Sequence, residues 1–548
     1  MRVLIIGGYG TFGGRLVDLL ADEKRLTLIV GGRDLRAAEA FCAARTGIAA
    51  RLEPARFDRT AGAAALRALA PDIVVDAAGP FQLYGDDPYA TVRAALEAGA
   101  HWIDLADGAA FVAGIGTVDD AARAAGRFAL AGASSFPVLT AAVVSRLAAD
   151  LPDVQSISAG IAPSPYAGVG LNVIRAIASY AGKPIDLLEG GRRQVRHGLI
   201  SSRRMTVNVP GQVPLWPIRF ALVEVPDLEV LPGEWPGLRT VWVGAGPLPA
   251  LLHRLLWLAA WVVRLRLMPS LVPIARLMDW VVNHVRWGEH RGGMVVEVTG
   301  GGHRASWHML AEGDAGPLIP SMAAEAIIRK VLDGQVPKPG ARPAHRELEL
   351  ADYEAMFARR GIISGIRREG AGTLYQHILG EAFERLVEPV RALHSFETVV
   401  RYQGRAEIKG AANAFGALIA RLFGFPPAGS DVPVEVELTR KDDVETWTRT
   451  FGGRRLRSTQ VEGRGRYDGL VVERFGPTRF GMAVTQNDGR LGLVLRRWDV
   501  LGLPMPHCLM PRVVSGEHAD DGRFHFLVDI SVPVLGRLVR YEGWLVPS

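Results

Sequence analysis

The fold of the first part of this chain is decided at residues 3–13, which read VLIIGGYGTFG. The apolar, largely β-branched residues 3–6 predict a short strand that is buried on both faces. The apolar periodicity that runs from Phe12 through Leu16 to Leu20 predicts a helix. A glycine-rich turn therefore lies between a strand and a helix, which is the setting of a dinucleotide-binding loop.

The glycines of this turn fit such a loop in two ways, and both stay open. Gly8, Gly10 and Gly13 satisfy GxGxxG, whereas Gly7, Gly10 and Gly13 satisfy GxxGxxG. In either case glycine permits a tight turn, and the free N–H groups of the helix N-terminus meet a pyrophosphate. The alternative is an ordinary glycine turn in a chain with 63 glycines. The expected cofactor-binding residues of this loop are Gly7, Gly8, Gly10, Thr11, Phe12 and Gly13.

The end of the second predicted strand favours NADP(H) over NAD(H). Residues 26–30 are apolar and are followed by Gly31-Gly32-Arg33-Asp34, with Arg36 close behind. An NAD site usually places a carboxylate at this strand end for the ribose, whereas a guanidinium suits a 2′-phosphate by charge and by its forked donors. The alternative is that Arg33 is a solvated loop charge and that Asp34 binds the ribose.

Strands and helices continue to alternate after this point. Residues 73–76, 102–105 and 128–131 are short apolar strands, and residues 89–98 and 118–125 have helical composition. This alternation predicts a parallel sheet covered by helices on both faces.

At these residues the sequence resembles the saccharopine dehydrogenase-like oxidoreductases. The resemblance rests on five stretches in the expected order, namely IIGGYGTFGGRL, GGRDLRAAEAF, DAAGPFQLYG, AGAHWIDLADG and GASSFPVLTAAVV. It covers residues 1 to about 145 and implies a Rossmann domain, an α+β domain inserted before the last helices, and nicotinamide chemistry. The family includes amino-acid dehydrogenases and lipid-linked reductases, so the resemblance does not fix a substrate.

The resemblance also implies that the loop at Gly79, Pro80 and Phe81 runs beneath the nicotinamide half of the cofactor. The residues 105–108, Leu-Ala-Asp-Gly, depart from the family, which often carries an acidic residue after a glycine in this second signature loop. The further expected cofactor-binding residues are Arg33, Asp34, Asp58, Ala78, Gly79, Pro80 and Phe81.

Catalytic residues cannot be read from any spacing in the chain. Hydride transfer needs only orientation, a dry site and one proton donor, so such an enzyme can lack a readable signature. We find no metal-ligand spacing, no Walker loop and no serine-elbow motif. The candidate catalytic residues are Tyr84, Asp104 and Asp107, with Tyr166, His197 and His303 as further scattered candidates.

The middle of the chain changes to an α+β pattern and holds an unusual apolar segment, residues 248–287. Paired tryptophans lie at Trp257 and Trp261, five arginines accompany the single carboxylate Asp279, and prolines divide the segment into two helices. A basic, Trp-rich amphipathic helix can lie in a membrane interface. The alternative is a core helix pair, a dimer surface or a lid over an apolar pocket, and we favour this group because buried helices are commoner.

From about residue 432 the pattern becomes short strands joined by turns. Asn487-Asp488-Gly489 and Asp520-Asp521-Gly522 are strong hairpin signals. The regular spacing predicts an antiparallel sheet that is curved or closed towards a barrel and accompanied by helices. This part resembles a bacterial domain of unknown function that often follows saccharopine dehydrogenase-like domains. A curved sheet can hold a small apolar ligand or can be an assembly module with a filled core, and both alternatives stay open.

The fold class is therefore predicted as α/β, with a doubly wound parallel Rossmann sheet, an α+β domain and a β-rich C-terminal domain. The predicted domains are a Rossmann domain (1–145), an α+β substrate or interface domain (146–320), a return helix and linker (321–365), and a β-rich accessory domain (373–548).

Composition excludes several classes of protein. Apolar residues make up 49% and charged residues 22% of the 548 residues, which argues against a disordered chain. The net charge of +6 is too small and too little localised to predict nucleic-acid binding. Two distant cysteines, Cys42 and Cys508, exclude a disulfide framework and thiolate zinc sites. We expect no secretory signal and no ordinary transmembrane helix.

We predict a cytoplasmic NADP(H)-dependent oxidoreductase that reduces an apolar or carrier-linked enoyl or carbonyl compound. The alternatives are an amino-acid dehydrogenase that acts on a C–N bond, and a non-catalytic NADPH-sensing or lipid-handling protein. The expected partner is a small apolar molecule and not a nucleic acid. Peripheral membrane contact through residues 248–287 and a homodimer remain open.

Overall fold

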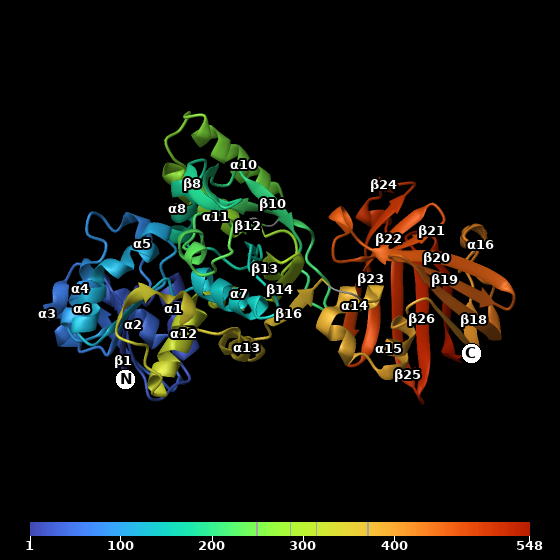
Figure 1. Cartoon of the computed structure of the whole chain (residues 1–548), viewed down its shortest axis with the longest axis horizontal. Helices are drawn as coiled ribbons and strands as arrows, with labels where there is room; N and C mark the ends of the chain where they lie inside the picture. The colour runs from blue at the N-terminus through green and yellow to red at the C-terminus, as the bar shows by residue number, and fades with distance from the viewer. Residues whose placement is uncertain (248–249, 285, 314, 370–371) are drawn as a thin grey trace. The chain divides into compact units, whose positions relative to one another are not determined.

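The computed structural model of the chain describes residues 1–247, 250–284, 286–313, 315–369 and 372–548, and it divides the chain into two compact units (Figure 1). The first unit comprises Met1–Met205 and Ile218–Ile363, and the second comprises Thr206–Pro217 and Ser364–Ser548. Within the described residues no helix has the length and apolar character needed to cross a membrane.

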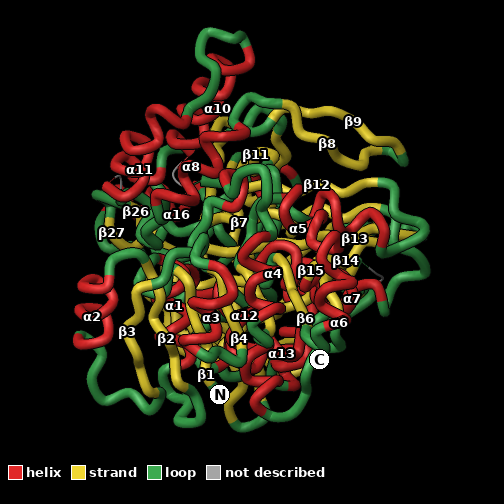
Figure 2. Tube along the Cα trace, turned by 90° about the vertical axis from the view of Figure 1, so that its left-hand side faces the viewer, coloured by secondary structure: helices red, strands yellow, loops and turns green. Residues whose placement is uncertain are grey.

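The first unit is built on a parallel sheet with the strand order β15-β6-β5-β4-β1-β2-β3 (Figure 2). Every neighbouring pair in this order is parallel, and the central strands β1 and β4 are almost entirely buried, as expected for strands covered on both faces. The strands are β1 (Arg2–Ile6), β2 (Thr27–Gly32), β3 (Arg51–Arg56), β4 (Ile73–Asp76), β5 (His101–Asp104), β6 (Phe128–Ala131) and β15 (Gly340–Pro343).

Helices cover both faces of this sheet, so the predicted doubly wound Rossmann fold is confirmed. On one face α1 packs against α12, and on the other α3 packs against α4. The helices of this region are α1 (Thr11–Leu20), α2 (Leu35–Ala43), α3 (Gly62–Leu69), α4 (Ala90–Glu97), α5 (Ala109–Gly114), α6 (Asp119–Ala124), α7 (Thr140–Ala148), α12 (Ile319–Leu332) and α13 (Leu350–Ala358).

A second, mixed sheet forms the rest of the first unit. Within this unit its strand order is β10-β11-β12-β7-β13-β14. The strands are β7 (Ser156–Ala162), β10 (Ser202–Met205), β11 (Ile218–Leu222), β12 (Thr240–Ala245), β13 (Gly292–Gly300) and β14 (His303–Ala311), with a separate hairpin of β8 (Pro184–Glu189) and β9 (Arg192–His197). The strand β16 (Ile363–Arg368) begins at the last residue of the first unit, and the rest of it belongs to the second unit. The helices are α8 (Leu171–Tyr180), α9 (Asp227–Val230), α10 (Ala250–Arg264) and α11 (Ala275–His284).

The predicted apolar segment 248–287 forms the two helices α10 and α11, separated as its prolines require. Residues 248, 249 and 285 of this segment lie outside the described residues. Both helices expose apolar side chains on the surface of the first unit, so the alternative of a fully buried core helix pair is wrong. The exposed apolar residues include Leu251, Leu255, Trp257, Leu258, Leu265, Leu277 and Trp280.

The second unit is a closed antiparallel barrel of ten strands. Its order is β22-β21-β20-β19-β18-β17-β27-β26-β25-β23, and the pairing of β22 with β23 closes the ring. The strands are β17 (Val399–Lys409), β18 (Gly429–Lys441), β19 (Val444–Phe451), β20 (Arg454–Glu462), β21 (Val471–Phe475), β22 (Thr478–Asn487), β23 (Arg490–Val500), β25 (Arg512–Asp520), β26 (Arg523–Val532) and β27 (Gly536–Pro547), with the short β24 (Leu503–Pro504) beside β23. Its helices are α14 (Leu374–Leu379), α15 (Glu388–His394) and α16 (Ala414–Leu422).

The two hairpin turns predicted from sequence occur where expected. Asp488 and Gly489 both have positive φ between β22 and β23, and Asp521 and Gly522 both have positive φ between β25 and β26. Positive φ at both turn residues matches the right-handed twist of the strands, which explains the Asp-Gly pairs. The barrel-like alternative for the C-terminal region is the one that the structure adopts.

Two short segments group differently from the sequence-based domains. The stretch 340–343, expected in a linker, is β15 and pairs with β6 as the seventh strand of the Rossmann sheet. The stretch 206–217, expected in the α+β domain, belongs to the second unit. The assignment of β15 depends on long-range pairing that no local pattern encodes.

Candidate functional site

The glycine loop after β1 has the tight geometry of a phosphate-binding turn. Gly7 has a φ of +76°, and the Gly10 N–H donates to the Gly7 carbonyl oxygen at 2.8 Å. A Cβ atom on Gly13 would lie 2.2 Å from the Gly7 oxygen, so only glycine lets α1 begin this close to the loop. The residues present therefore fit the pyrophosphate of a dinucleotide.

The β2 end of the sheet presents guanidinium groups rather than a free carboxylate. Arg33 and Arg36 are exposed. Asp34 is the N-cap residue of α2, and its side chain accepts a hydrogen bond from the Ala37 N–H at 3.2 Å. The structure thus gives the Asp34 carboxylate a local role in capping the helix, while the arginines stay available for a 2′-phosphate.

Asp58 lies just beyond the end of β3, on the side of the sheet where the cofactor loops lie. Its carboxylate accepts hydrogen bonds from the N–H and the hydroxyl of Thr60, and these bonds hold its pKa below the usual range. The guanidinium of Arg33 contributes to the same shift. Asp58 and Arg33, which lie far apart in sequence, therefore belong to one charged group at this edge.

The predicted nicotinamide loop is held by a residue that the sequence analysis missed. The side-chain amide of Asn172, in the first turn of α8, donates to the carbonyl oxygens of Ala78 at 3.3 Å and Gly79 at 3.1 Å. Just before it, Gly170 packs so closely on Thr11 that a Cβ atom there would lie 2.9 Å from the threonine hydroxyl. One segment of the α+β region therefore contacts both predicted cofactor loops.

Tyr84 forms a buried pair with a carboxyl that ends β4. The Tyr84 hydroxyl donates to Asp76 at 2.9 Å, and the guanidinium of Arg59 lies 3.6 Å from the tyrosine ring centre. Burial raises the pKa of the fully buried Asp76 to about 6, and it raises the pKa of Tyr84 as well. Phe81, from the nicotinamide loop, packs against the same ring at 4.8 Å.

Asp104, the last residue of β5, accepts hydrogen bonds from β5 itself and from the loops that follow β5 and β6. Its carboxylate accepts from the Trp102 indole N–H at 2.9 Å, the Ala106 N–H at 3.1 Å and the Gly132 N–H at 2.8 Å. Burial raises its pKa to about 7 in spite of these donors. These three hydrogen bonds connect Asp104 to β5, to the loop after it and to the loop after β6.

Asp107 is connected to the predicted nicotinamide loop through one side chain. The side-chain amide of Gln82, next to Phe81, donates to it at 3.2 Å. Burial raises the pKa of Asp107, and it also raises the pKa of Glu224, whose carboxyl interacts with that of Asp107. Asp107 therefore holds a proton to higher pH than an ordinary aspartate does.

The other scattered candidates do not converge. Tyr166 stacks on His290 with ring centres 3.7 Å apart, and its hydroxyl donates to the Arg286 carbonyl. His197 ends β9, where burial lowers its pKa, and His303 is exposed at the start of β14. Within the described part of the chain, no cluster of three or more His, Cys, Asp or Glu side chains is placed to hold a metal ion.

An apolar cavity of about 210 Å³ lies beneath α10 and α11. The loop 163–169 forms one wall of this cavity, and the same loop continues into Gly170 and Asn172, which contact the cofactor loops. Asn283 of α11 holds the loop by accepting from the Val169 N–H and donating to the Val169 carbonyl oxygen, both at 3.1 Å. The cavity and the predicted nicotinamide loop are thus joined by a few residues of one ordered segment.

Comparisons with known proteins agree with this geometry. Residues 3–130 match the family model of the saccharopine dehydrogenase NADP binding domain, and residues 386–545 match a domain of unknown function (DUF4166). A comparison with curated proteins found no match. The first match gives this chain an NADP-binding domain of oxidoreductase type, and the protein is an NADP-dependent oxidoreductase.

Solved structures resemble the chain only distantly. A biliverdin reductase from Synechocystis, in complex with biliverdin and NADP+, is 15% identical, with a TM-score of 0.31, over 64% of this chain and 94% of that chain. A myo-inositol dehydrogenase from Corynebacterium glutamicum is 11% identical, with a TM-score of 0.29, over 62% and 91%. A secretary abundant heat soluble protein from Ramazzottius varieornatus is 10% identical, with a TM-score of 0.17, over 27% and 93%.

Proposed function

We propose that this protein reduces an apolar enoyl or carbonyl compound, free or linked to a carrier, with hydride from NADPH. The observation that supports this substrate class is the cavity beneath α10 and α11. Among the described residues that line it, every side chain is uncharged, and leucine, valine and proline predominate. An amino-acid substrate would need charged partners there, so the apolar compound is the better fit.

The proposed cofactor site combines three parts of the first unit. The loop from Gly7 to Gly13 would hold the pyrophosphate, Arg33 with Arg36 would bind the 2′-phosphate, and the loop 78–81 would lie against the nicotinamide half. Bound NADPH would supply the hydride. Asn172 would position the loop 78–81 relative to the cavity, because it bonds two carbonyl oxygens of that loop.

Reduction of an enoyl or carbonyl group also needs a proton, and we assign its donor as Asp107. Its raised pKa keeps the carboxyl protonated at a higher pH than an exposed aspartate. Its hydrogen bond from Gln82 places it beside the nicotinamide loop. Tyr84 and Asp104 would instead shape the loop and the strand ends.

The experiment that tests this function follows NADPH absorbance with a panel of medium-chain and long-chain enals, ketones and enoyl thioesters. Val282 lines the cavity, and Val282→Trp should fill it and lower kcat/KM at least about tenfold, because a ligand that loses its pocket loses 1.4 kcal/mol or more. The matched control is Val195→Trp at an exposed position of β9. NADPH consumption by none of the panel, or equal loss in both variants, would contradict the proposal.

The outer face of the same two helices supports a proposal about location. Arg254, Arg264, Arg266, Arg276 and Arg286 are all exposed, whereas Asp279 is half-buried and bonded by Asn283. Exposed leucines and tryptophans lie on the same helices. Apolar and cationic side chains together match the interface of an anionic membrane, so we propose that α10 and α11 dock there and that the apolar substrate enters from it.

A further inference from the structure

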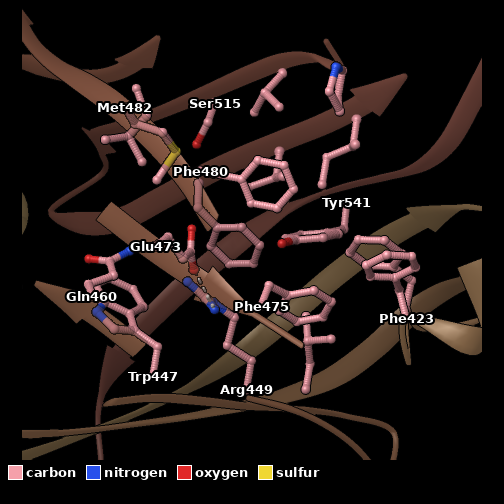
Figure 3. A pocket seen from close by; sticks show the side chains of 18 of the residues that line it. Phe423, Trp447, Arg449, Gln460, Glu473, Phe475, Phe480, Met482, Ser515 and Tyr541 are labelled. Atoms are coloured by element: carbon pink, nitrogen blue, oxygen red, sulfur yellow. Dashed lines mark ion pairs between the residues drawn. The ribbon is translucent and has the colours of Figure 1, made fainter. Parts of the chain in front are cut away.

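The interior of the C-terminal barrel is an apolar cavity of about 280 Å³ (Figure 3). This volume lies near the lower end of the roughly 300–1,000 Å³ of ligand pockets. All its lining residues belong to the second unit, so the cavity is independent of the reductase site. Aliphatic and aromatic residues make up most of the wall, and its phenylalanines are Phe423, Phe425, Phe451, Phe475, Phe480, Phe524 and Phe526.

Strand alternation explains why this wall is apolar. Along β26, residues Phe524, Phe526, Val528 and Ile530 line the cavity, whereas Leu527 between them does not. Successive side chains of a strand point to opposite faces, so every second residue of each strand contributes to the interior. A barrel of about eight strands already has room for either packed side chains or one small ligand, and this barrel has ten strands.

One group of polar side chains in the cavity wall lies on β19 and β21, whereas Ser515 and Glu517 of β25 line the cavity elsewhere. Arg449 and Glu473 form an ion pair at 3.8 Å, and the Ser458 hydroxyl bonds both residues, accepting from Arg449 at 3.1 Å and donating to Glu473 at 2.6 Å. The hydroxyl of Tyr541 points into the cavity towards this pair (Figure 3). A ligand in the apolar part of the cavity would therefore meet hydrogen-bonding groups at one end.

The charges of the wall select against an anionic ligand. Arg449 is the one cationic residue among those that line the described cavity, and Glu473 and Glu517 are its anionic residues. Glu517 also bonds the buried His394 at 2.7 Å. Since Glu473 already offsets Arg449, a carboxylate or phosphate would enter without a free counter-charge, whereas a hydroxyl or carbonyl group needs none.

Helix α16 covers part of this cavity. Ile419 of α16 and Phe423 just after it line the cavity from inside. The outer face of the same helix exposes Phe415, Leu418 and Leu422 by 60%, 53% and 77%. A helix that is apolar on both sides places an apolar surface over this part of the barrel.

From the cavity, its largely apolar wall and the polar cluster formed by Arg449, Glu473 and Tyr541, we infer that the barrel is a binding site for a neutral, mainly apolar molecule with one hydroxyl or carbonyl group. The molecule lies among the phenylalanines, and its polar group contacts the side where Arg449, Glu473 and Tyr541 lie. This site is separate from the proposed reductase activity, and the test below uses no NADPH.

The test uses the neutral fluorescent probe N-phenyl-1-naphthylamine with the full-length protein. Val528 lines the cavity, whereas its neighbour Leu527 does not. Val528→Trp should therefore fill the cavity and abolish probe binding in the barrel, and Leu527→Trp should retain this binding. Ser515→Phe fills the same cavity from the neighbouring strand and should have the same effect. Because the cavity beneath α10 and α11 can also take the probe, only the difference between these variants identifies the barrel.

Equal probe binding by Val528→Trp and Leu527→Trp, at matched far-UV circular dichroism, would overturn the site. Displacement of the probe that is bound in the barrel, measured at pH 8, then tests the class of ligand. We expect 1-dodecanol to displace the probe at a concentration about tenfold lower than dodecanoate does, which corresponds to about 1.4 kcal/mol. Equal or better displacement by dodecanoate would overturn the assignment of a neutral ligand.

Discussion

The side-chain amide of Asn172 lies 3.1 Å from the carbonyl oxygen of Gly79, although 93 residues separate them in the chain. The same amide reaches the carbonyl of Ala78, and Gly170 beside it packs on Thr11. The first turn of α8 therefore connects the loop after β1, the loop after β4 and the apolar cavity. In the proposed function, the positions of cofactor and substrate would both depend on this one short segment outside the Rossmann sheet.

Replacing Asn172 by Ala should lower kcat/KM for NADPH-dependent reduction by about one order of magnitude. Two hydrogen bonds to the loop 78–79 are lost, and each is worth about 0.5–1.5 kcal/mol. Steady-state kinetics with the substrate found in the panel measures the change. Ser179→Ala is the control, because its hydroxyl bonds only within α8. An equal effect of both substitutions would show that the amide does not position the loop.

Replacing Arg33 by Ala should remove most of the preference for NADPH over NADH. A charge-assisted hydrogen bond to the 2′-phosphate is worth about 1.5–3 kcal/mol, and NADH has no such phosphate. Calorimetric titration of both cofactors measures the difference. Arg51→Ala at the opposite end of the sheet should leave it unchanged. Equal affinities of the unmutated protein for NADPH and NADH would contradict the role of Arg33.

Replacing Asp107 by Asn should lower kcat by about two orders of magnitude, the usual contribution of a general acid, while the protein stays folded. Asparagine keeps an acceptor for Gln82 but holds no acidic proton. Since the pKa of Asp107 is raised and only its protonated form donates, kcat of the unmutated enzyme should fall as the pH rises through that pKa. A pH profile of Asp107→Asn that still shows this fall would assign the proton to another group. Asp120→Asn, at an exposed position, is the control.

Asp227 should make the first unit less stable as the pH rises. Its side chain is fully buried, and burial raises its folded pKa to about 7, above the unfolded value near 3.9. Its contribution to stability is complete below the unfolded pKa and is lost as the pH rises through the folded one. Relative to the unmutated protein, Asp227→Asn should gain about 1.4 kcal/mol of unfolding free energy per pH unit between pH 5 and about 7.

Urea unfolding at pH 5 and pH 8 measures this difference. Asp186→Asn replaces an exposed carboxyl of β8 and should show no comparable dependence on pH. A pH-independent difference between Asp227→Asn and the unmutated protein would mean that the carboxyl is already ionised in the fold.

The helices α10 and α11 should bind vesicles that contain phosphatidylserine, with a blue shift of the emission of Trp257 and Trp261, whose rings lie 5.9 Å apart. Reversal of Arg254 and Arg276 to Glu should weaken co-sedimentation at least about tenfold, because each arginine near an anionic surface contributes about 1 kcal/mol. The same reversal at the exposed Arg51 and Arg192 is the control. Higher salt should weaken the binding as well.

Equal sedimentation of both double variants would contradict the membrane proposal. A concentration-dependent dimer without vesicles, lost on Trp280→Ala, would instead assign this apolar face to a second copy of the chain. Trp280 is 58% exposed and is therefore free to make either contact.

Local sequence patterns were enough to predict five of the seven Rossmann strands, the glycine loop and the hairpin turns of the barrel. The run of β-branched apolar residues before Gly7 favours a buried strand, and Asp488-Gly489 can take positive φ with little strain. The predicted preference for NADP(H) is equally local, because it depends on the residue, Arg33, that follows the second strand. Each of these features is determined within a few residues, so the sequence alone predicts it.

The tertiary structure decided everything that depends on partners far away in the chain. The strand β15 has four residues and no pattern of its own, and it exists because β6 offers an open edge. The pairing of β22 with β23 closes the barrel, and only closure turns an apolar strand face into a cavity. The local sequence around Asn172 shows only a residue near the start of a helix, and its contact with Gly79 exists only in the folded chain. Backbone propensity acts over one turn or strand, whereas a binding site is made by side chains that only the packed chain brings together.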